Sequence, residues 1–162
     1  MSTIAENIAA IRARIDAAAR TTGRTGADIT LVAATKMNDA ARVREAVAAG
    51  IDACGENRVQ EMVAKLAENA YDGAPLHFIG VLQKNKVRQV VGQVDLIHSV
   101  DSMGLLDEID KRAAMNGLTQ NILLEVNIGG EDSKSGFRPE EVESAIKAVL
   151  ARPERHVRIQ GL

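Results

Sequence analysis

Lys36 is the residue of this sequence whose type and place most clearly point to chemistry. It follows the uncharged run 29–35, which is long enough for a buried strand and too short for a helix. Functional sites of parallel α/β proteins assemble where strands end, and a lysine amine among small apolar neighbours can attack carbonyl carbons. The alternative is a strand-end lysine whose side chain extends into water, and position alone favours that interpretation.

The run Gly55-Glu56-Asn57-Arg58 follows a second short apolar segment, 51–54. Glycine permits close approach of a ligand to the backbone, and the Asn57 amide offers both a donor and an acceptor. The alternative is a simple strand-to-helix turn in which Asn57 caps the next helix. Spacing alone favours the cap.

Other candidate groups give weaker signals. His77, His98 and His156 are too scattered for a metal motif, so we expect no metal site and interpret His77 and His98 as strand residues. Cys54 is expected to be a small buried hydrophobe. The polar loop 129–136 lacks the spacing of a phosphate-binding or dinucleotide-binding motif, which leaves a functional loop and a plain surface loop equally open.

Apolar periodicity predicts the elements that position these residues. Expected helices are 2–22, capped by Ser2, then 40–49, 58–69, 83–91, 102–116 and 139–150. Expected strands are 29–35, 51–54, 76–80, 94–100, 121–128 and 157–162.

This strict alternation of strand and helix predicts a parallel α/β sheet covered by helices, because parallel neighbours need a crossover connection. An open doubly wound sheet and a barrel both fit. In the segment 121–128, Leu124, Val126 and Ile128 share an apolar face, whereas Glu125 and Asn127 make the other face polar toward the strand end. That pattern favours a barrel strand approaching a site. We expect a single domain, 1–162. Because a (β/α)8 barrel has eight strands, the six strands expected here indicate either a smaller sheet or an incomplete barrel.

Composition limits the classes of function. The 162 residues carry 20 basic and 22 acidic side chains, a net charge of −2, which gives no electrostatic footprint for nucleic acid or an anionic membrane. Aromatic residues make up only 2%, which disfavours base stacking. No apolar run approaches a membrane span, and a single cysteine fits a reducing compartment. We expect a cytoplasmic protein.

Five motifs in order carry a resemblance to a known family. They are Leu31-Val-Ala-Ala-Thr-Lys36, Gly55-Glu-Asn-Arg-Val-Gln-Glu61, His77-Phe-Ile-Gly-Val-Leu-Gln-Lys-Asn-Lys86, Ile97-His-Ser-Val-Asp-Ser102, and Leu124-Glu-Val-Asn-Ile128 with Ser133-Lys-Ser-Gly-Phe137. Each motif alone is weak, but together they closely resemble the pyridoxal phosphate homeostasis proteins, which have an alanine-racemase-like barrel without a second domain.

The resemblance implies a (β/α)8 TIM barrel that holds pyridoxal 5′-phosphate (PLP) at the carboxyl ends of its strands. It implies that Lys36 forms a Schiff base with the PLP aldehyde and that Asn57 lies beside the cofactor; we include His77 among the expected cofactor-binding residues. It also implies a role in vitamin B6 homeostasis without established catalysis. Oligomeric state is left open, with a monomer expected for a full-length member.

The sequence also departs from the family pattern. Cys54 and Leu76 stand where members commonly have an aromatic residue and a tryptophan. Members continue beyond residue 162 with the loops that hold the cofactor phosphate, so we expect residues 1–162 to be truncated and to bind PLP weakly. The alternatives are a PLP-dependent, racemase-like enzyme and a truncated scaffold that binds no PLP. The only tyrosine, Tyr71, lies in a predicted loop, which disfavours a racemase.

Overall fold

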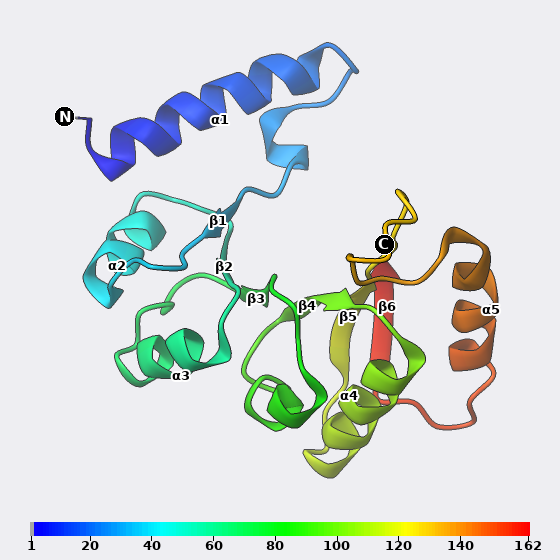
Figure 1. The fold of residues 1–162 in the computed structure, drawn as a ribbon. Helices are drawn as coiled ribbons and strands as arrows, with labels where there is room; N and C mark the ends of the chain where they lie inside the picture. Colours follow the sequence, from blue (N-terminus) through cyan, green and yellow to red (C-terminus); the bar gives the residue numbers. More distant parts are fainter. Residues whose placement is uncertain (1) are drawn as a thin grey trace. The chain divides into compact units, whose positions relative to one another are not determined.

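The computed structural model describes residues 2–162 and contains six parallel strands covered by helices (Figure 1). The strands follow one another in the sheet in chain order, β1 to β6. A doubly wound sheet reverses its order at a switch point, whereas a barrel does not, so the sequential order identifies the barrel type of α/β sheet. The chain comprises two compact units, residues 1–76 and 77–162.

The first unit contains three helices and two complete strands. Its elements are α1 (Ile4–Arg20), the 3₁₀ helix η1 (Gly26–Asp28), β1 (Val32–Ala34), α2 (Ala40–Ala48), β2 (Ala53–Glu56) and α3 (Val59–Ala67). Thr3, not Ser2, caps α1, and Glu6 completes the capping box. Asp39 caps α2 by accepting from the Arg42 amide.

The second unit contains the remaining strands. β3 (Leu76–Phe78) begins at its boundary and is followed by η2 (Lys84–Gln89), β4 (Leu96–Val100), α4 (Met103–Met115), β5 (Gln120–Leu124), α5 (Pro139–Leu150) and β6 (Val157–Gly161). Ser102 caps α4. Ile97, Leu106, Ile109 and Ile122 are fully buried between the strands and α4, so aliphatic side chains form this core as the composition predicts.

Several predicted elements differ from the structure. β2 begins two residues later than expected and includes Gly55 and Glu56, which places both on a strand. The segment predicted as a helix at 83–91 forms a short 3₁₀ helix, where closely spaced valines disfavour a longer α-helix. β1 is only three residues long, since residues 29–31, which follow η1, lie outside the strand.

The strand predicted over 121–128 ends at Leu124. Beyond it the Phe137 amide donates to the Glu125 carbonyl at 2.8 Å, and the Asn127 amide donates to the Phe137 carbonyl at 2.9 Å. The Glu125 carbonyl and the Asn127 amide are therefore hydrogen-bonded to Phe137, at the end of the polar loop. Ile128 is 85% exposed, so the expectation that it joins an apolar face against helices was wrong. Among the described helices, none is long and apolar enough to cross a membrane.

Candidate functional site

Lys36 and Asn57 lie at equivalent positions beyond two neighbouring parallel strands. Ala34 of β1 is in register with Gly55 of β2, and the Thr35 amide extends the ladder by donating to the Gly55 carbonyl at 2.9 Å. Lys36 and Asn57 each follow this last pair by two residues. Because side chains alternate between the faces of a sheet, the register places both residues on the same face, at the carboxyl ends of their strands.

Asn57 has a buried acceptor that no described residue satisfies. The residue is half-buried, and its Oδ1 atom has no hydrogen-bond partner. The N-cap position of α3 is Arg58, without a side-chain cap, so the interpretation of Asn57 as the helix cap was wrong. An unpaired acceptor shielded from water is costly and is characteristic of a position that meets a ligand or an ordered water.

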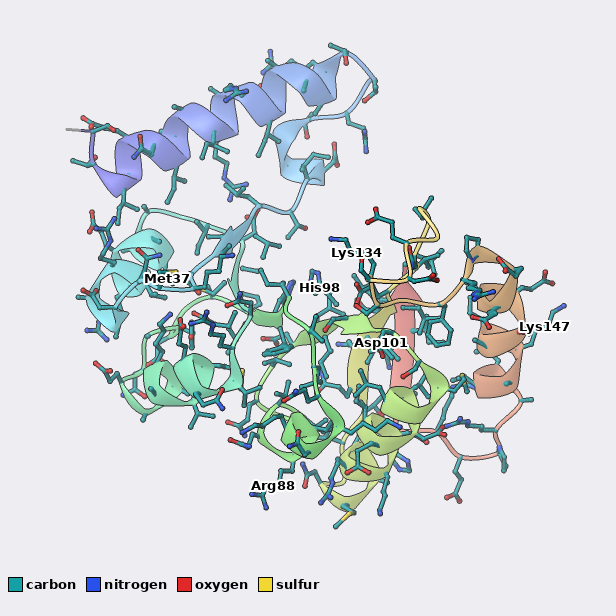
Figure 2. All side chains as sticks on the ribbon, in the orientation of Figure 1. Met37, Arg88, His98, Asp101, Lys134 and Lys147 are labelled. Carbon is teal, nitrogen blue, oxygen red and sulfur yellow. The ribbon has the colours of Figure 1, made fainter. Side chains whose placement is uncertain are left out.

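Lys36 is exposed in a tight turn after β1. Its carbonyl accepts from the Asn38 amide side chain at 3.1 Å, and the next residue, Met37, has a φ of 60°. This left-handed conformation is uncommon outside glycine and asparagine, and it marks the turn as strained. Figure 2 shows the Met37 side chain at this turn, where it is 82% exposed.

A buried ion pair lies behind this turn, on the opposite face of the strands. Glu56 is 0% exposed and Lys65 of α3 is 6% exposed, and Lys65 Nζ lies 2.7 Å from Glu56 Oε1. Oε1 also accepts from the Thr35 hydroxyl at 2.6 Å and from the Tyr71 hydroxyl at 3.1 Å. Burial, reinforced by the Glu56 carboxylate, raises the Tyr71 pKa, so the phenol stays a donor.

Neither the motifs nor their spacing indicated this cluster, although the position of Lys65 in the sequence carries one signal for it. Lys65 occurs on the face of α3 that also buries Val59 and Met62 at helical spacing. A lysine at an apolar position of a helix requires a buried partner. That partner is Glu56, the last residue of the preceding strand β2.

In the second unit, His77 on β3 and His98 on β4 form a hydrogen-bonded pair. His98 Nε2 lies 3.0 Å from His77 Nδ1, and both rings are half-buried. Desolvation lowers the pKa of each imidazole, and for His98 the neighbouring His77 lowers it further. The interpretation of both histidines as hydrogen-bonded strand residues is confirmed, whereas a contact of His77 with a cofactor stays a prediction.

The remaining candidates add no further groups to the site. The polar loop is tied down by Asn127, whose side-chain amide donates to the Glu131 carbonyl at 2.8 Å, and Lys134 on this loop is exposed (Figure 2). Within residues 2–162 no group of three or more His, Cys, Asp and Glu side chains is placed to hold a metal ion. Cys54 is fully buried, and burial raises its pKa to about 11.

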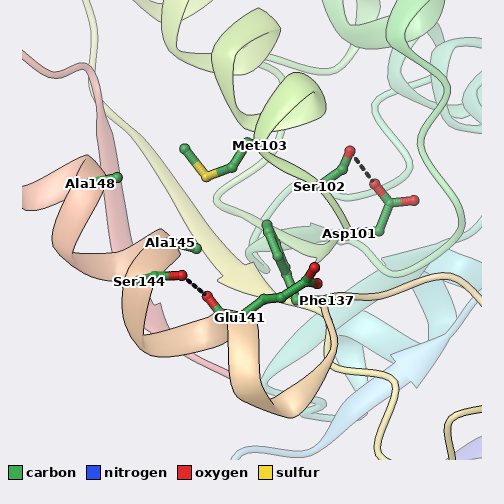
Figure 3. A pocket seen from close by; sticks show the side chains of 8 residues that line it. All are labelled: Asp101, Ser102, Met103, Phe137, Glu141, Ser144, Ala145 and Ala148. Carbon is green, nitrogen blue, oxygen red and sulfur yellow. Dashed lines mark hydrogen bonds between the residues drawn. The ribbon is translucent and has the colours of Figure 1, made fainter.

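A pocket of about 540 Å³ lies between the start of α4 and α5 (Figure 3). Asp101, Ser102, Phe137 and Glu141 contribute to its wall. Ser102 donates to Asp101 at 2.9 Å, and its hydroxyl also caps α4. The pocket contains none of Lys36, Asn57 and His77, and its polar groups are occupied in structural hydrogen bonds.

The chain is similar to known proteins along most of its length. The family model for the alanine racemase N-terminal domain matches residues 6–162. A pyridoxal phosphate homeostasis protein of Pseudomonas aeruginosa is 42% identical over the whole chain, and one of Escherichia coli K12 is 37% identical. The chain spans 70% of the length of each of these two relatives. It belongs to the pyridoxal phosphate homeostasis protein family.

Solved structures support both the family and the fold. PipY of Synechococcus elongatus PCC7942, in a structure described as having PLP bound, is 34% identical with a TM-score of 0.82, and the match covers 99% of this chain and 69% of PipY. A protein of Bifidobacterium adolescentis gives a TM-score of 0.87 at 37% identity, covering 98% of this chain and 68% of that one. An alanine racemase of Clostridium difficile 630 shares 17% identity and a TM-score of 0.62 over 83% of this chain and 35% of its own, which shows the fold alone.

Proposed function

We propose that this chain binds pyridoxal 5′-phosphate and serves intracellular PLP homeostasis, with Lys36 as the residue that attaches the cofactor. The observation that carries the proposal is the pairing of an exposed lysine amine with the unsatisfied Asn57 oxygen at the ends of two adjacent parallel strands. Membership in the pyridoxal phosphate homeostasis protein family and the PLP-bound PipY structure support it.

The residues present fit the reactive side of PLP. Lys36 would supply the amine that condenses with the PLP aldehyde, with loss of one water, and so would hold the cofactor as a Schiff base. The buried Asn57 carbonyl oxygen needs a donor that no described residue supplies, which leaves it available to a donor group of a ligand. When bound, PLP supplies an electron-withdrawing ring conjugated to the linkage.

The decisive experiment is to locate the lysine that PLP modifies. The protein is mixed with PLP, reduced with borohydride, digested and analysed by mass spectrometry. We expect the adduct to concentrate on Lys36, because its site also offers the Asn57 oxygen. Adducts scattered over exposed lysines such as Lys147 and Lys134 would overturn the assignment.

Two substitutions sharpen this experiment. Lys36→Ala should abolish the Schiff-base absorbance at substoichiometric PLP. The matched control is Lys147→Ala, which removes an exposed lysine of α5 and should leave the absorbance unchanged. Asn57→Ala should weaken PLP binding by about tenfold, the effect of one lost hydrogen bond of about 1.4 kcal/mol. An unaltered absorbance in Lys36→Ala would show that another lysine is used.

We propose a binding role rather than a catalytic one, in the cytoplasm. The family relatives are named for homeostasis and not for an enzymatic reaction. A racemase of this fold needs a second acid or base opposite the lysine, and the only tyrosine here is buried and donates to Glu56. Detectable racemisation of an amino acid by the PLP-loaded protein would favour the enzyme, and failure to attach PLP at Lys36 would favour a scaffold without cofactor.

A further inference from the structure

The backbone on both sides of Lys36 is anchored by charged groups of the first unit. The Thr35 carbonyl accepts from Lys65 Nζ at 2.8 Å, and the Met37 amide donates to Glu61 Oε2 at 2.9 Å. Lys65 and Glu61 both belong to α3 and are one turn apart, with their charged atoms 3.7 Å from each other. A single helix therefore hydrogen-bonds to the backbone of the residue before Lys36 and of the residue after it.

The anchor on the Thr35 side cannot rearrange easily. Three donors converge on Glu56 Oε1, whereas Glu56 Oε2 has no partner among the described residues. The compensation of this fully buried carboxylate therefore rests on one oxygen, and moving Thr35 or Lys65 would leave buried charge uncompensated. Such a cluster acts as a rigid support for the turn in front of it.

The anchor on the Met37 side holds a strained conformation. Met37 has a φ of 60° although its side chain is 82% exposed, so packing of its own side chain does not impose this geometry. Within the turn, Asn38 donates to the Thr35 and Lys36 carbonyls, and from outside it Glu61 accepts from the Met37 amide; this last bond lowers the Glu61 pKa and favours the charged carboxylate. Release of Met37 would let the turn relax to ordinary dihedral angles and redirect Lys36.

We propose that Glu61, with the Lys65–Glu56 pair behind it, is a positioning residue that fixes the turn in which Lys36 presents its amine. In this proposal Glu61 and Lys65 act through the backbone of Met37 and Thr35, to which they are hydrogen-bonded. This inference rests on the proposed function, since it assumes that Lys36 is the attachment point. The apparent affinity for PLP then scales with the fraction of molecules whose turn is in the held conformation.

The test compares three variants on α3. Glu61→Ala removes the acceptor for the Met37 amide, Glu61→Gln retains an acceptor oxygen without the charge, and Glu68→Ala removes an exposed carboxylate at the C-cap of the same helix as a control. Glu61 is partly exposed, so its substitution spares the buried core. Hydrogen exchange of the Met37 amide and PLP affinity from the Schiff-base absorbance are measured for each, together with the urea midpoint.

We expect Glu61→Ala to accelerate Met37 exchange and weaken PLP binding by about tenfold each, with Glu61→Gln restoring most of both and Glu68→Ala unchanged. If Glu61 had a merely structural role, Glu61→Ala would shift the urea midpoint, and Glu61→Gln would not selectively restore the exchange rate of the Met37 amide. Unchanged PLP affinity in Glu61→Ala, with wild type attaching PLP at Lys36, would overturn the positioning role alone. Absence of a Lys36 adduct in wild type would instead overturn the proposed function.

Discussion

Lys65 carries a positive charge into a position of α3 where its neighbours Val59 and Met62 are buried. We expect Lys65→Met to lower the free energy of unfolding by about 3 kcal/mol, because it leaves the Glu56 carboxylate buried without its cation. The double variant Glu56→Met/Lys65→Met should lose less than Lys65→Met alone, since it removes both charges together. Urea unfolding measures both values.

A larger loss in the double variant would contradict this account of the pair. It would mean that the hydroxyls of Thr35 and Tyr71, left without their common acceptor, matter more than the buried charge. The comparison therefore separates the ionic contribution of the cluster from its neutral hydrogen bonds.

At the same scale, the sequence marked Lys36 and Asn57 as candidates only through the family resemblance, because position and spacing alone favoured ordinary structural roles for both. The structure adds that they follow neighbouring strands in register. Helical spacing could have marked Lys65 as buried, but it does not identify Glu56, nine positions away on a strand, as its partner. The strained Met37 turn has no glycine to signal it.

Among the connecting elements, the polar loop depends on one glycine. Gly136 has a φ of 118°, and an added Cβ would lie 2.7 Å from the Asn127 amide nitrogen and 3.1 Å from the Glu125 carbonyl oxygen. We expect Gly136→Ala to cost about 3 kcal/mol in urea unfolding, through backbone clash and strain together. Gly130 in the same loop has a φ of 63° and open space around it, so Gly130→Ala should cost only about 1 kcal/mol.

Equal losses of unfolding free energy in Gly130→Ala and Gly136→Ala would show that the loop adjusts its backbone without losing its pairing to Phe137. In that case the hydrogen bonds of Asn127 and Glu125 with Phe137 would not be what fixes the end of β5. The sequence predicted this loop as a functional or a plain surface segment and gave no sign of the backbone pairing that holds it.

The β3–β4 pair introduces a pH dependence through its histidines. The folded-state pKa values of His77 and His98 are lowered by burial, so near and below pH ~6.5 the unfolded chain binds more protons than the folded one. We expect this part of the stability to be complete above pH ~6.5 and to be lost as the pH falls through the folded pKa values. In His98→Gln the urea midpoint should change less between pH 7 and pH 5 than it does in the wild type. An unchanged slope of the midpoint against pH would contradict the effect.

For the molecule as a whole, carboxylates that accept hydrogen bonds should govern stability in acid. Asp52 is the clearest case, because its hydrogen bonds with Arg12, at 2.7 Å and 2.8 Å, lower its pKa, assisted by the Leu31 amide. Its contribution is present above the unfolded pKa of about 3.9 and lost as the pH falls through the lower folded value. Asp16, which accepts from the Gly26 amide, acts in the same direction.

Asp52→Asn should therefore reduce the slope of unfolding free energy against pH between pH ~5 and pH ~2, while Asp132→Asn, on the exposed loop, should not. The measurement is a series of urea unfolding curves across this range. A parallel loss of slope in both variants would mean that overall charge, and not the Arg12 contact, is responsible.

The parallel α/β architecture could be predicted at this scale because alternating strand and helix periods allow few arrangements. Element boundaries were less predictable, since backbone partners from distant segments decide where a strand ends, as Phe137 does for β5. The polarity of 121–128 and the family resemblance favoured a barrel over a doubly wound sheet, and the sequential order of the strands agrees with the barrel.

The burial of Cys54 has a chemical consequence for the proposed binding of an aldehyde cofactor. Thiolates add readily to aldehydes, but the one sulfhydryl of this chain is enclosed beside the core and remains protonated up to a pH of about 11. In the folded state it neither competes with an amine for the carbonyl group nor joins two molecules through a disulfide. The proposed linkage to the aldehyde therefore depends on an amine and not on the thiol.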